Sequence, residues 1–153
     1  MSKMNNKNKL IVNNRKARHD YHILESYEAG IELFGKEVKS IRQGKVNIAD
    51  CYAQIISGEV WLIGMHISPY EQAGQFNEDP LRKRKLLLHK REIRKLEIAV
   101  TQKGLTLIPT KLYFKDALVK VEISIAKGKK NYDKREDLKR KEIEKQIKRQ
   151  VDQ

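Results

Sequence analysis

Basic side chains are the most concentrated chemical groups in this sequence, and they gather in two segments. Residues 81–95, LRKRKLLLHKREIRK, contain eight Lys and Arg side chains and one Glu, a net charge of +7. Residues 127–153 contain 11 basic and six acidic side chains, a net charge of +5. Together the segments carry +12 of the total charge of +13. This balance favours a polyanionic partner, and nucleic acid is the commonest one.

Three consecutive leucines, Leu86 to Leu88, interrupt the first basic segment. We expect them to anchor it to a hydrophobic core, so that its charges are displayed on a fixed surface. Against an RNA backbone, such a surface would release counterions and bind in a salt-dependent way. A merely solvated helix face is the alternative interpretation. The tyrosines Tyr21, Tyr27, Tyr52 and Tyr70 are candidates for base stacking, although half-buried packing is the more common role of a tyrosine.

Catalytic and metal-binding chemistry have little support, and no cofactor is expected. The four histidines are scattered, and no pair has the i, i+4 spacing of helical metal ligands. The single cysteine, Cys51, falls in a predicted strand, where we expect a small buried hydrophobe. Residues 30–36 match the start of a P-loop, but Glu37 stands where that motif needs a Ser or Thr hydroxyl. A nucleotide-binding enzyme is therefore the weakest hypothesis.

Compartment and assembly are indicated only indirectly. No apolar run approaches the roughly 20 residues of a membrane-spanning helix, and the N-terminal residues lack the long apolar stretch of a signal peptide. One cysteine suits a reducing compartment. We expect a cytoplasmic monomer with no membrane partner.

Strands joined by hairpins are expected to position the basic groups. Apolar residues with a period of two predict a strand from Tyr21 to Leu33. Residues 51–56 and 59–67 flank Ser57-Gly58 at the spacing of a two-residue hairpin. The side chains expected to point inward in its second arm are Trp61, Ile63, Met65 and Ile67.

A second hairpin is predicted for residues 104–114 and 117–126, with its turn at Lys115-Asp116. Pro109 indicates an edge strand or a bulge in its first arm. Short helices are expected around Val38 and from about His89. Five or six short antiparallel strands in this length are typical of a small barrel or a tightly curled sheet, so the fold class is mainly β.

The two ends of the chain differ from this body. Residues 1–13 are polar and rich in Asn and Lys, and we expect a disordered leader. In residues 127–153 a thin apolar stripe recurs at spacings of 5, 4 and 4: Leu138, Ile143, Ile147 and Val151. Such a helix gains little from packing. We expect a tail that is disordered when free and helical on a polyanionic surface.

Five sequence blocks in order resemble the SsrA-binding protein (small protein B, SmpB) family: NRKARHDY (14–21), YEAGIEL (27–33), GKEVKSIRQGKVNIADCYA (35–53), RKLLLHKREI (84–93) and AKGKKNYDKR (126–135). The resemblance implies an OB-fold-like antiparallel β-barrel over residues 14–126, with about three short helices, and a basic C-terminal tail over 127–153. It implies a non-enzymatic adaptor of trans-translation, which binds the tRNA-like domain of transfer-messenger RNA (tmRNA) and delivers it to stalled 70S ribosomes. The tail would enter the vacant mRNA channel and decoding centre, against ribosomal RNA.

The resemblance also implies two sets of RNA-contacting residues. The tmRNA-binding set would be Tyr21, Glu28, Glu37, Lys39, Arg42, Asn47, Arg82, Arg84, Lys85, Leu87 and Lys120. The decoding-centre set in the tail would be Lys127, Gly128, Lys129, Lys130, Asp133, Lys134 and Arg135.

Some features of these sets stay open. A structural strand carboxylate is the alternative role for Glu28. Lys36, Glu78 and Thr110 depart from the usual residues of the family, and Glu78 has no evident role beside a phosphate backbone. The runner-up function is a structural ribosome-associated barrel that binds ribosomal RNA without specificity.

Overall fold

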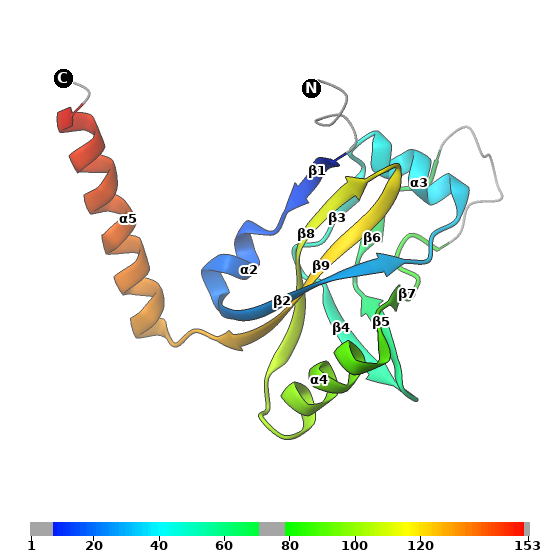
Figure 1. Cartoon of the computed structure of the whole chain (residues 1–153). Helices are drawn as coiled ribbons and strands as arrows, with labels where there is room; N and C mark the ends of the chain where they lie inside the picture. The colour runs from blue at the N-terminus through cyan, green and yellow to red at the C-terminus, as the bar shows by residue number, and fades with distance from the viewer. Residues whose placement is uncertain (1–7, 71–78, 152–153) are drawn as a thin grey trace.

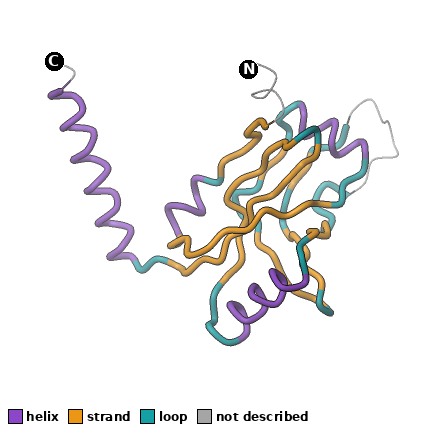
Figure 2. Tube along the Cα trace, in the orientation of Figure 1, coloured by secondary structure: helices purple, strands orange, loops and turns teal. Residues whose placement is uncertain are grey.

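A curled antiparallel sheet forms the body of the protein. The computed structural model describes residues 8–70 and 79–151. Seven strands follow the order β1-β8-β4-β5-β7-β2-β9, and β9 also pairs with β8, so the sheet curves back on itself. A single residue pair, Ala53 with Leu107, joins β4 to β8, and the barrel is therefore not strictly closed. The fold is mainly β and OB-like, as predicted (Figures 1 and 2).

The strands and helices have the following bounds. The main sheet contains β1 (Asn8–Asn13), β2 (Tyr21–Ile31), β4 (Tyr52–Ile56), β5 (Glu59–Ile63), β7 (Arg84–Leu87), β8 (Thr106–Lys115) and β9 (Leu118–Gly128). The short strands β3 (Val46–Asn47) and β6 (His66–Ile67) pair with each other. The helices are α2 (Arg15–Asp20), α3 (Gly35–Arg42), α4 (Lys90–Thr101) and α5 (Asn131–Val151).

The first predicted hairpin is confirmed, but the prediction of which side chains point inward is wrong for part of its second arm. Ser57 and Gly58 both have positive φ, which matches the right-handed twist of the flanking strands. In β5 the fully buried residues are Val60 and Leu62, while Trp61 and Ile63 are half-buried. Met65 and Ile67 are buried as predicted.

Gly64 explains the change of phase between these two parts. It lies between β5 and β6 with φ of 86°, and a Cβ added there would be 3.1 Å from the carbonyl oxygen of Asp50. Because the chain leaves strand geometry at this residue, the alternation is offset by one position after it.

The second hairpin is also confirmed, with its turn one residue later than predicted, at Asp116-Ala117. Strand register shifts between Pro109 and Lys111, so the proline marks a bulge. Strand β8 is bonded to β1, β4 and β9 and is not an edge strand. The predicted helices around Val38 and after His89 are confirmed as α3 and α4.

The expectation of a disordered leader is wrong for residues 8–13, which form strand β1. Residues 1–7 lie outside the described residues. Strand β1 pairs with β8 from Asn8, opposite Lys115, to Asn13, opposite Lys111. The buried Asn14 secures its end: Nδ2 donates to the carbonyls of Pro109 at 2.8 Å and Ile48 at 3.1 Å. Its Oδ1 accepts from the amide of Ala17 and so caps α2.

The tail is the helix α5, which extends away from the barrel beyond the end of β9 (Figure 1). Its aliphatic side chains Leu138, Ile143 and Ile147 are each more than half exposed. The expectation that this segment is disordered when free stays a prediction. Across the described residues, no helix is both long and apolar enough to cross a membrane.

Candidate nucleic-acid interface

The basic run of residues 81–95 rests on a buried ion pair. The carboxylate of Glu37, in the first turn of α3, accepts from Nε of Arg84 at 2.7 Å and from Nε of Arg82 at 3.1 Å. Arg84 also donates to the carbonyls of Met65 and Pro80. Its side chain is wholly buried, and only 7% of the Glu37 side chain is exposed.

Burial raises the pKa of Glu37, but hydrogen bonds from Arg82, the Phe34 amide and Arg84 outweigh it, so the pKa lies below its usual range. Sequence reasoning placed Glu37 and Arg84 in the RNA-facing set. The structure instead places both side chains in the interior, because each satisfies the other's charge there. They support the basic surface from below and do not form it.

Arg82 is the outer member of this network. It pairs with Glu37 and lies over the ring of Phe34, with Cζ 4.4 Å from the ring centroid. Phe34 precedes α3 and is 47% exposed. Sequence reasoning did not single it out, although an aromatic residue directly before a helix rich in charge was a usable signal.

Leu87 and Lys120 lie on opposite sides of one glycine, Gly30. In β2, Gly30 pairs with Leu87 of β7 and with Lys120 of β9. A Cβ at Gly30 would approach the Leu87 Cβ to 3.3 Å, which explains the small residue there. Leu87 is 48% exposed, and Lys85 forms an ion pair with Glu59 at 3.0 Å. Gly30, Leu87 and Lys120 line one hollow of the surface.

Glu28 is held by neighbours on the same sheet. Its carboxylate accepts from the Tyr113 hydroxyl at 2.6 Å and from Lys115 Nζ at 3.2 Å. The Tyr113 hydrogen bond, with help from Lys115, lowers the pKa of Glu28. The side chain is 39% exposed, so an ionised, oriented acceptor faces solvent here. This geometry fits both the RNA-contacting role and the structural role considered from the sequence.

The remaining predicted residues near α3 are more dispersed. Lys39 lies over the ring of Tyr70 at 5.4 Å, and Arg42 lies over the ring of Phe114 at 5.8 Å. The Asn47 side chain accepts from the amide of Ala49 at 2.8 Å, a local turn bond. Glu78 and most of the loop that contains it lie outside the described residues.

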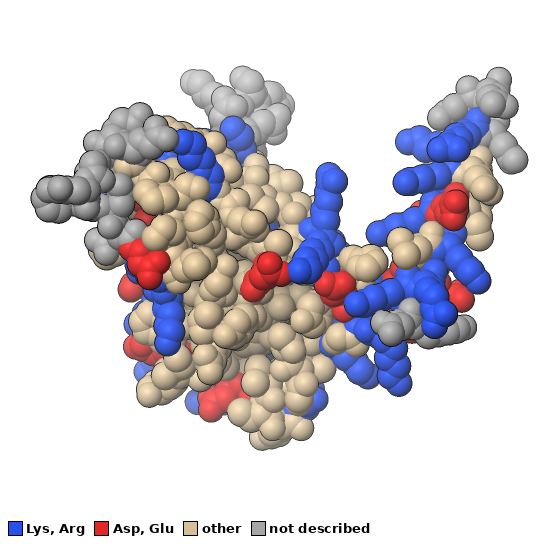
Figure 3. Space-filling model, turned by 180° about the vertical axis from the view of Figure 1, so that it is seen from behind, with Lys and Arg blue, Asp and Glu red and all other residues tan. Residues whose placement is uncertain are grey.

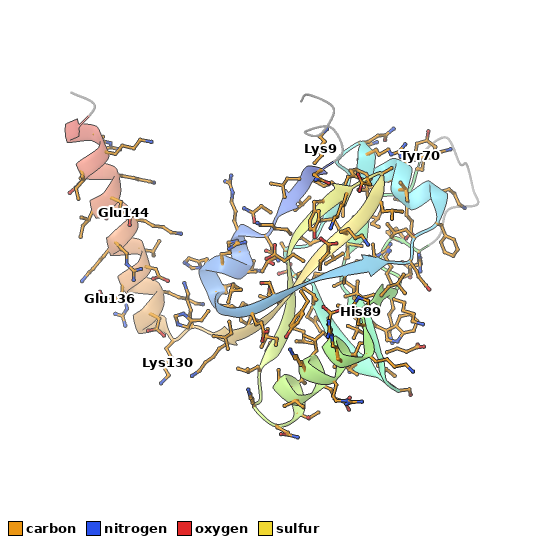
Figure 4. The ribbon with its side chains drawn as sticks, viewed as in Figure 1. Lys9, Tyr70, His89, Lys130, Glu136 and Glu144 are labelled. Carbon is orange, nitrogen blue, oxygen red and sulfur yellow. The ribbon has the colours of Figure 1, made fainter. Side chains whose placement is uncertain are left out.

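The base of the tail is tied to α2 and β2 by polar contacts. Lys127 and Gly128 still belong to β9, opposite His22 and Tyr21 of β2. The Lys129 amide donates to the carbonyl of Asp20 at 2.8 Å, and its Nζ donates to the carbonyl of Arg18. Lys129 also pairs with the Asp137 carboxylate. Figure 4 shows Lys130 at this junction, with Glu136 and Glu144 farther along α5.

Two further tail residues contact the barrel side. Asp133 lies 3.4 Å from Nε2 of His22, and Lys134 lies 3.3 Å from the carboxylate of Asp20. The His22 contact lowers the pKa of Asp133, and hydrogen bonds from His19 and Lys134 lower the pKa of Asp20. Arg135 is exposed. We call these four side chains, His22 and Asp20 with Asp133 and Lys134, the tail clasp.

Part of the predicted set therefore falls at the two ends of the β2–β9 pair. One end carries Gly30 with Leu87 and Lys120, and the other carries Tyr21, Gly128 and the tail clasp. On the face seen in Figure 3, Lys and Arg gather along α5 and at its base, whereas the barrel surface beside it carries few charges.

A curled β-barrel that carries a basic surface and a basic helical tail defines an RNA-binding class of protein. Comparisons with known proteins give the family. The model of the family described as "SmpB protein" matches residues 11–153, and the chain belongs to that family.

Curated relatives and a solved structure agree with this assignment. The chain is 62% identical to the SsrA-binding protein of Gloeothece citriformis over 150 residues, which cover 97% of each chain. It is 61% identical to the SsrA-binding protein of Clostridium tetani, over 95% of this chain and 90% of that protein. A structure described as "tmRNA-SmpB: a journey to the center of the bacterial ribosome" is 54% identical, with a TM-score of 0.66 over 78% of this chain and 85% of that one.

Proposed function

We propose that this protein is an RNA-binding adaptor of trans-translation, which binds the tRNA-like domain of tmRNA and delivers it to stalled 70S ribosomes. The observation that carries the proposal is the separation of basic groups between a rigid barrel surface and an extended tail, in a chain of the SmpB family. A generic polyanion binder needs only one basic surface.

On the barrel, recognition combines charge with fixed polar groups. Lys85 and Lys120 supply phosphate contacts and salt dependence, and Arg82 is held in place by Glu37 and Arg84. The ionised Glu28 accepts hydrogen bonds from base amino groups or ribose hydroxyls. Leu87 adds an exposed apolar contact beside them.

In the tail, the decoding-centre set acts on ribosomal RNA. Asp133, Lys134 and Arg135 lie in the first turns of α5, next to the barrel, so their position depends on how the barrel is seated. The remaining basic groups of α5 follow the RNA of the vacant mRNA channel. The protein makes and breaks no covalent bond in this role. It acts in the cytoplasm as a monomer without cofactor or metal.

Two binding measurements test the proposal. Affinity for the tRNA-like domain should exceed affinity for an unrelated hairpin of equal length at the same salt concentration. Equal affinities would favour a generic ribosomal RNA binder instead. Truncation after Lys130 should leave binding to the tRNA-like domain nearly unchanged and abolish peptide tagging on stalled ribosomes. Loss of RNA binding together with the tail would contradict this division of roles.

A further inference from the structure

Phe34, Glu37 and Arg82 form a closed cycle of contacts. The amide of Phe34 donates to Oε1 of Glu37 at 2.9 Å. Oε1 of Glu37 also accepts from Nη2 of Arg82 at 2.5 Å, and the Arg82 guanidinium lies over the Phe34 ring at 4.4 Å. Because Arg84 holds the other oxygen of Glu37, the guanidinium is fixed from below. The ring and the cation are thus preorganised against each other.

The ring itself contributes little to the hydrophobic interior. Phe34 belongs to neither cluster of core residues and is 47% exposed, whereas its neighbour Leu33 packs against the main core. Arg82 covers part of the ring, and its own side chain is only 23% exposed. Nearly half of the ring is therefore accessible to a partner, while Arg82 holds it from one side.

The groups around the ring favour an anionic polymer as that partner. Lys83 is exposed next to Arg82, and Lys36 is half-buried two positions after Phe34. The carbonyl of Lys85 accepts from the amide of Glu32, two positions before Phe34. An aromatic side chain beside a fixed cation and further basic residues can stack on an unpaired nucleobase while the basic residues neutralise the phosphates of the RNA backbone.

We propose that Phe34, backed by Arg82, is a stacking site for an unpaired nucleobase of the bound RNA. The inference rests on the proposed function for the identity of that RNA. Glu37 is the positioning residue, since it holds Arg82 against the ring. The Arg82 cation on the ring strengthens the stack and sets its orientation.

The first test compares Phe34→Leu with the unchanged protein in titrations of the tRNA-like domain. Stacking on one base is worth about 1–3 kcal/mol, so we expect about a 5- to 150-fold weaker Kd with an unchanged salt slope. Phe34→Tyr should restore most of the affinity. The matched control is Leu24→Ala, which removes another exposed apolar side chain from the barrel and should leave Kd unchanged.

A second test detects the stack directly. In a Phe34→Trp variant that also carries Trp61→Phe, the single Trp at position 34 should lose fluorescence when the tRNA-like domain binds. Unchanged fluorescence, or Phe34→Leu binding with the original affinity, would overturn the stacking site.

The same titrations separate the two proposals. If the unchanged protein fails to prefer the tRNA-like domain over the hairpin, the proposed function fails. If it shows that preference and Phe34→Leu also retains it at full affinity, only the stacking site fails.

Discussion

Nε of Arg84 donates a 2.7 Å hydrogen bond to Oε2 of Glu37, and both side chains are almost wholly buried. The pair joins α3 to β7, two elements that are 47 positions apart in the sequence. It therefore fixes the helix that carries Lys39 and Arg42 against the strand that carries Lys85 and Leu87. The basic surface has its shape because of this internal contact.

Replacing Glu37 with Gln should destabilise the fold strongly. The amide leaves the buried Arg84 cation without its counter-charge, and breaking a buried pair in this way costs about 3–5 kcal/mol. The measurement is the free energy of unfolding in urea. The control is Glu59→Gln, which removes an exposed partner of Lys85 and should cost about 0–1 kcal/mol. Similar losses in the two variants would argue against an internal role for Glu37.

The same carboxylate predicts how stability depends on pH. The pKa of Glu37 is lower in the folded protein than in the unfolded chain, so its contribution is fully present above the unfolded value. The contribution is lost as pH falls below about 4.3 and through the lower folded value. Urea unfolding between pH 7 and pH 3 should show an acid limb that is shallower in Glu37→Gln. Parallel limbs in both proteins would assign the acid sensitivity to other groups.

Glu28 and Lys85 should affect RNA binding in different ways. Glu28→Ala should reduce the preference for the tRNA-like domain over a hairpin with little change in the salt slope, since a carboxylate contacts no phosphate. Lys85→Ala should reduce that slope by about one phosphate contact and weaken binding to both RNAs. The readout is Kd at several salt concentrations. An unchanged preference in Glu28→Ala would support the purely structural role that its Tyr113 and Lys115 contacts also fit.

The tail clasp should restrain the first turns of α5. Asp20→Asn removes the counter-charge of Lys134 but keeps the side-chain size, and the backbone bond from Lys129 to the Asp20 carbonyl remains. We expect faster amide hydrogen exchange in residues 131–137 and unchanged exchange in β9. Glu144→Gln, which changes an exposed carboxylate farther along the helix, is the control and should change neither. Equal exchange in Asp20→Asn and the unchanged protein would show that the clasp does not restrain the tail.

A peptide of residues 127–153 should be largely unfolded in circular dichroism at 25 °C. Its apolar stripe is thin, and without the barrel it loses the partners Asp20 and His22. Addition of an RNA polyanion should raise its helix content. A peptide that is already fully helical would contradict the expectation of a tail that folds on contact.

Local patterns predicted most elements, and the differences come from contacts between distant residues. The hairpin at Ser57-Gly58 follows from the two-residue spacing between apolar runs and from Gly58, a residue type that readily adopts positive φ. Strand β1 was missed because its polar residues gain order only by pairing with β8 and through the hydrogen bonds of Asn14.

Prediction of the candidate site was also incomplete because some of its contacts join residues that are distant in the sequence. Charged residues in a basic run normally face solvent, so nothing local marks Arg84 as buried. Its burial depends on the carboxylate of Glu37 in a distant helix, which meets it on the side of β7 that also carries Leu86. Phe34 was missed because the residue that stacks on it lies 48 positions away in the chain.

Strand β9 runs without interruption from Leu118 to Gly128, and it carries Lys120 near one end and Lys127 near the other. Seven residues of extended chain correspond to about 23 Å. If both ends contact RNA as proposed, the length of the strand sets the distance between the two bound RNAs. Deleting one residue within it would shorten that spacing by only about 3 Å, but it would turn one of the two lysines to the opposite side of the sheet.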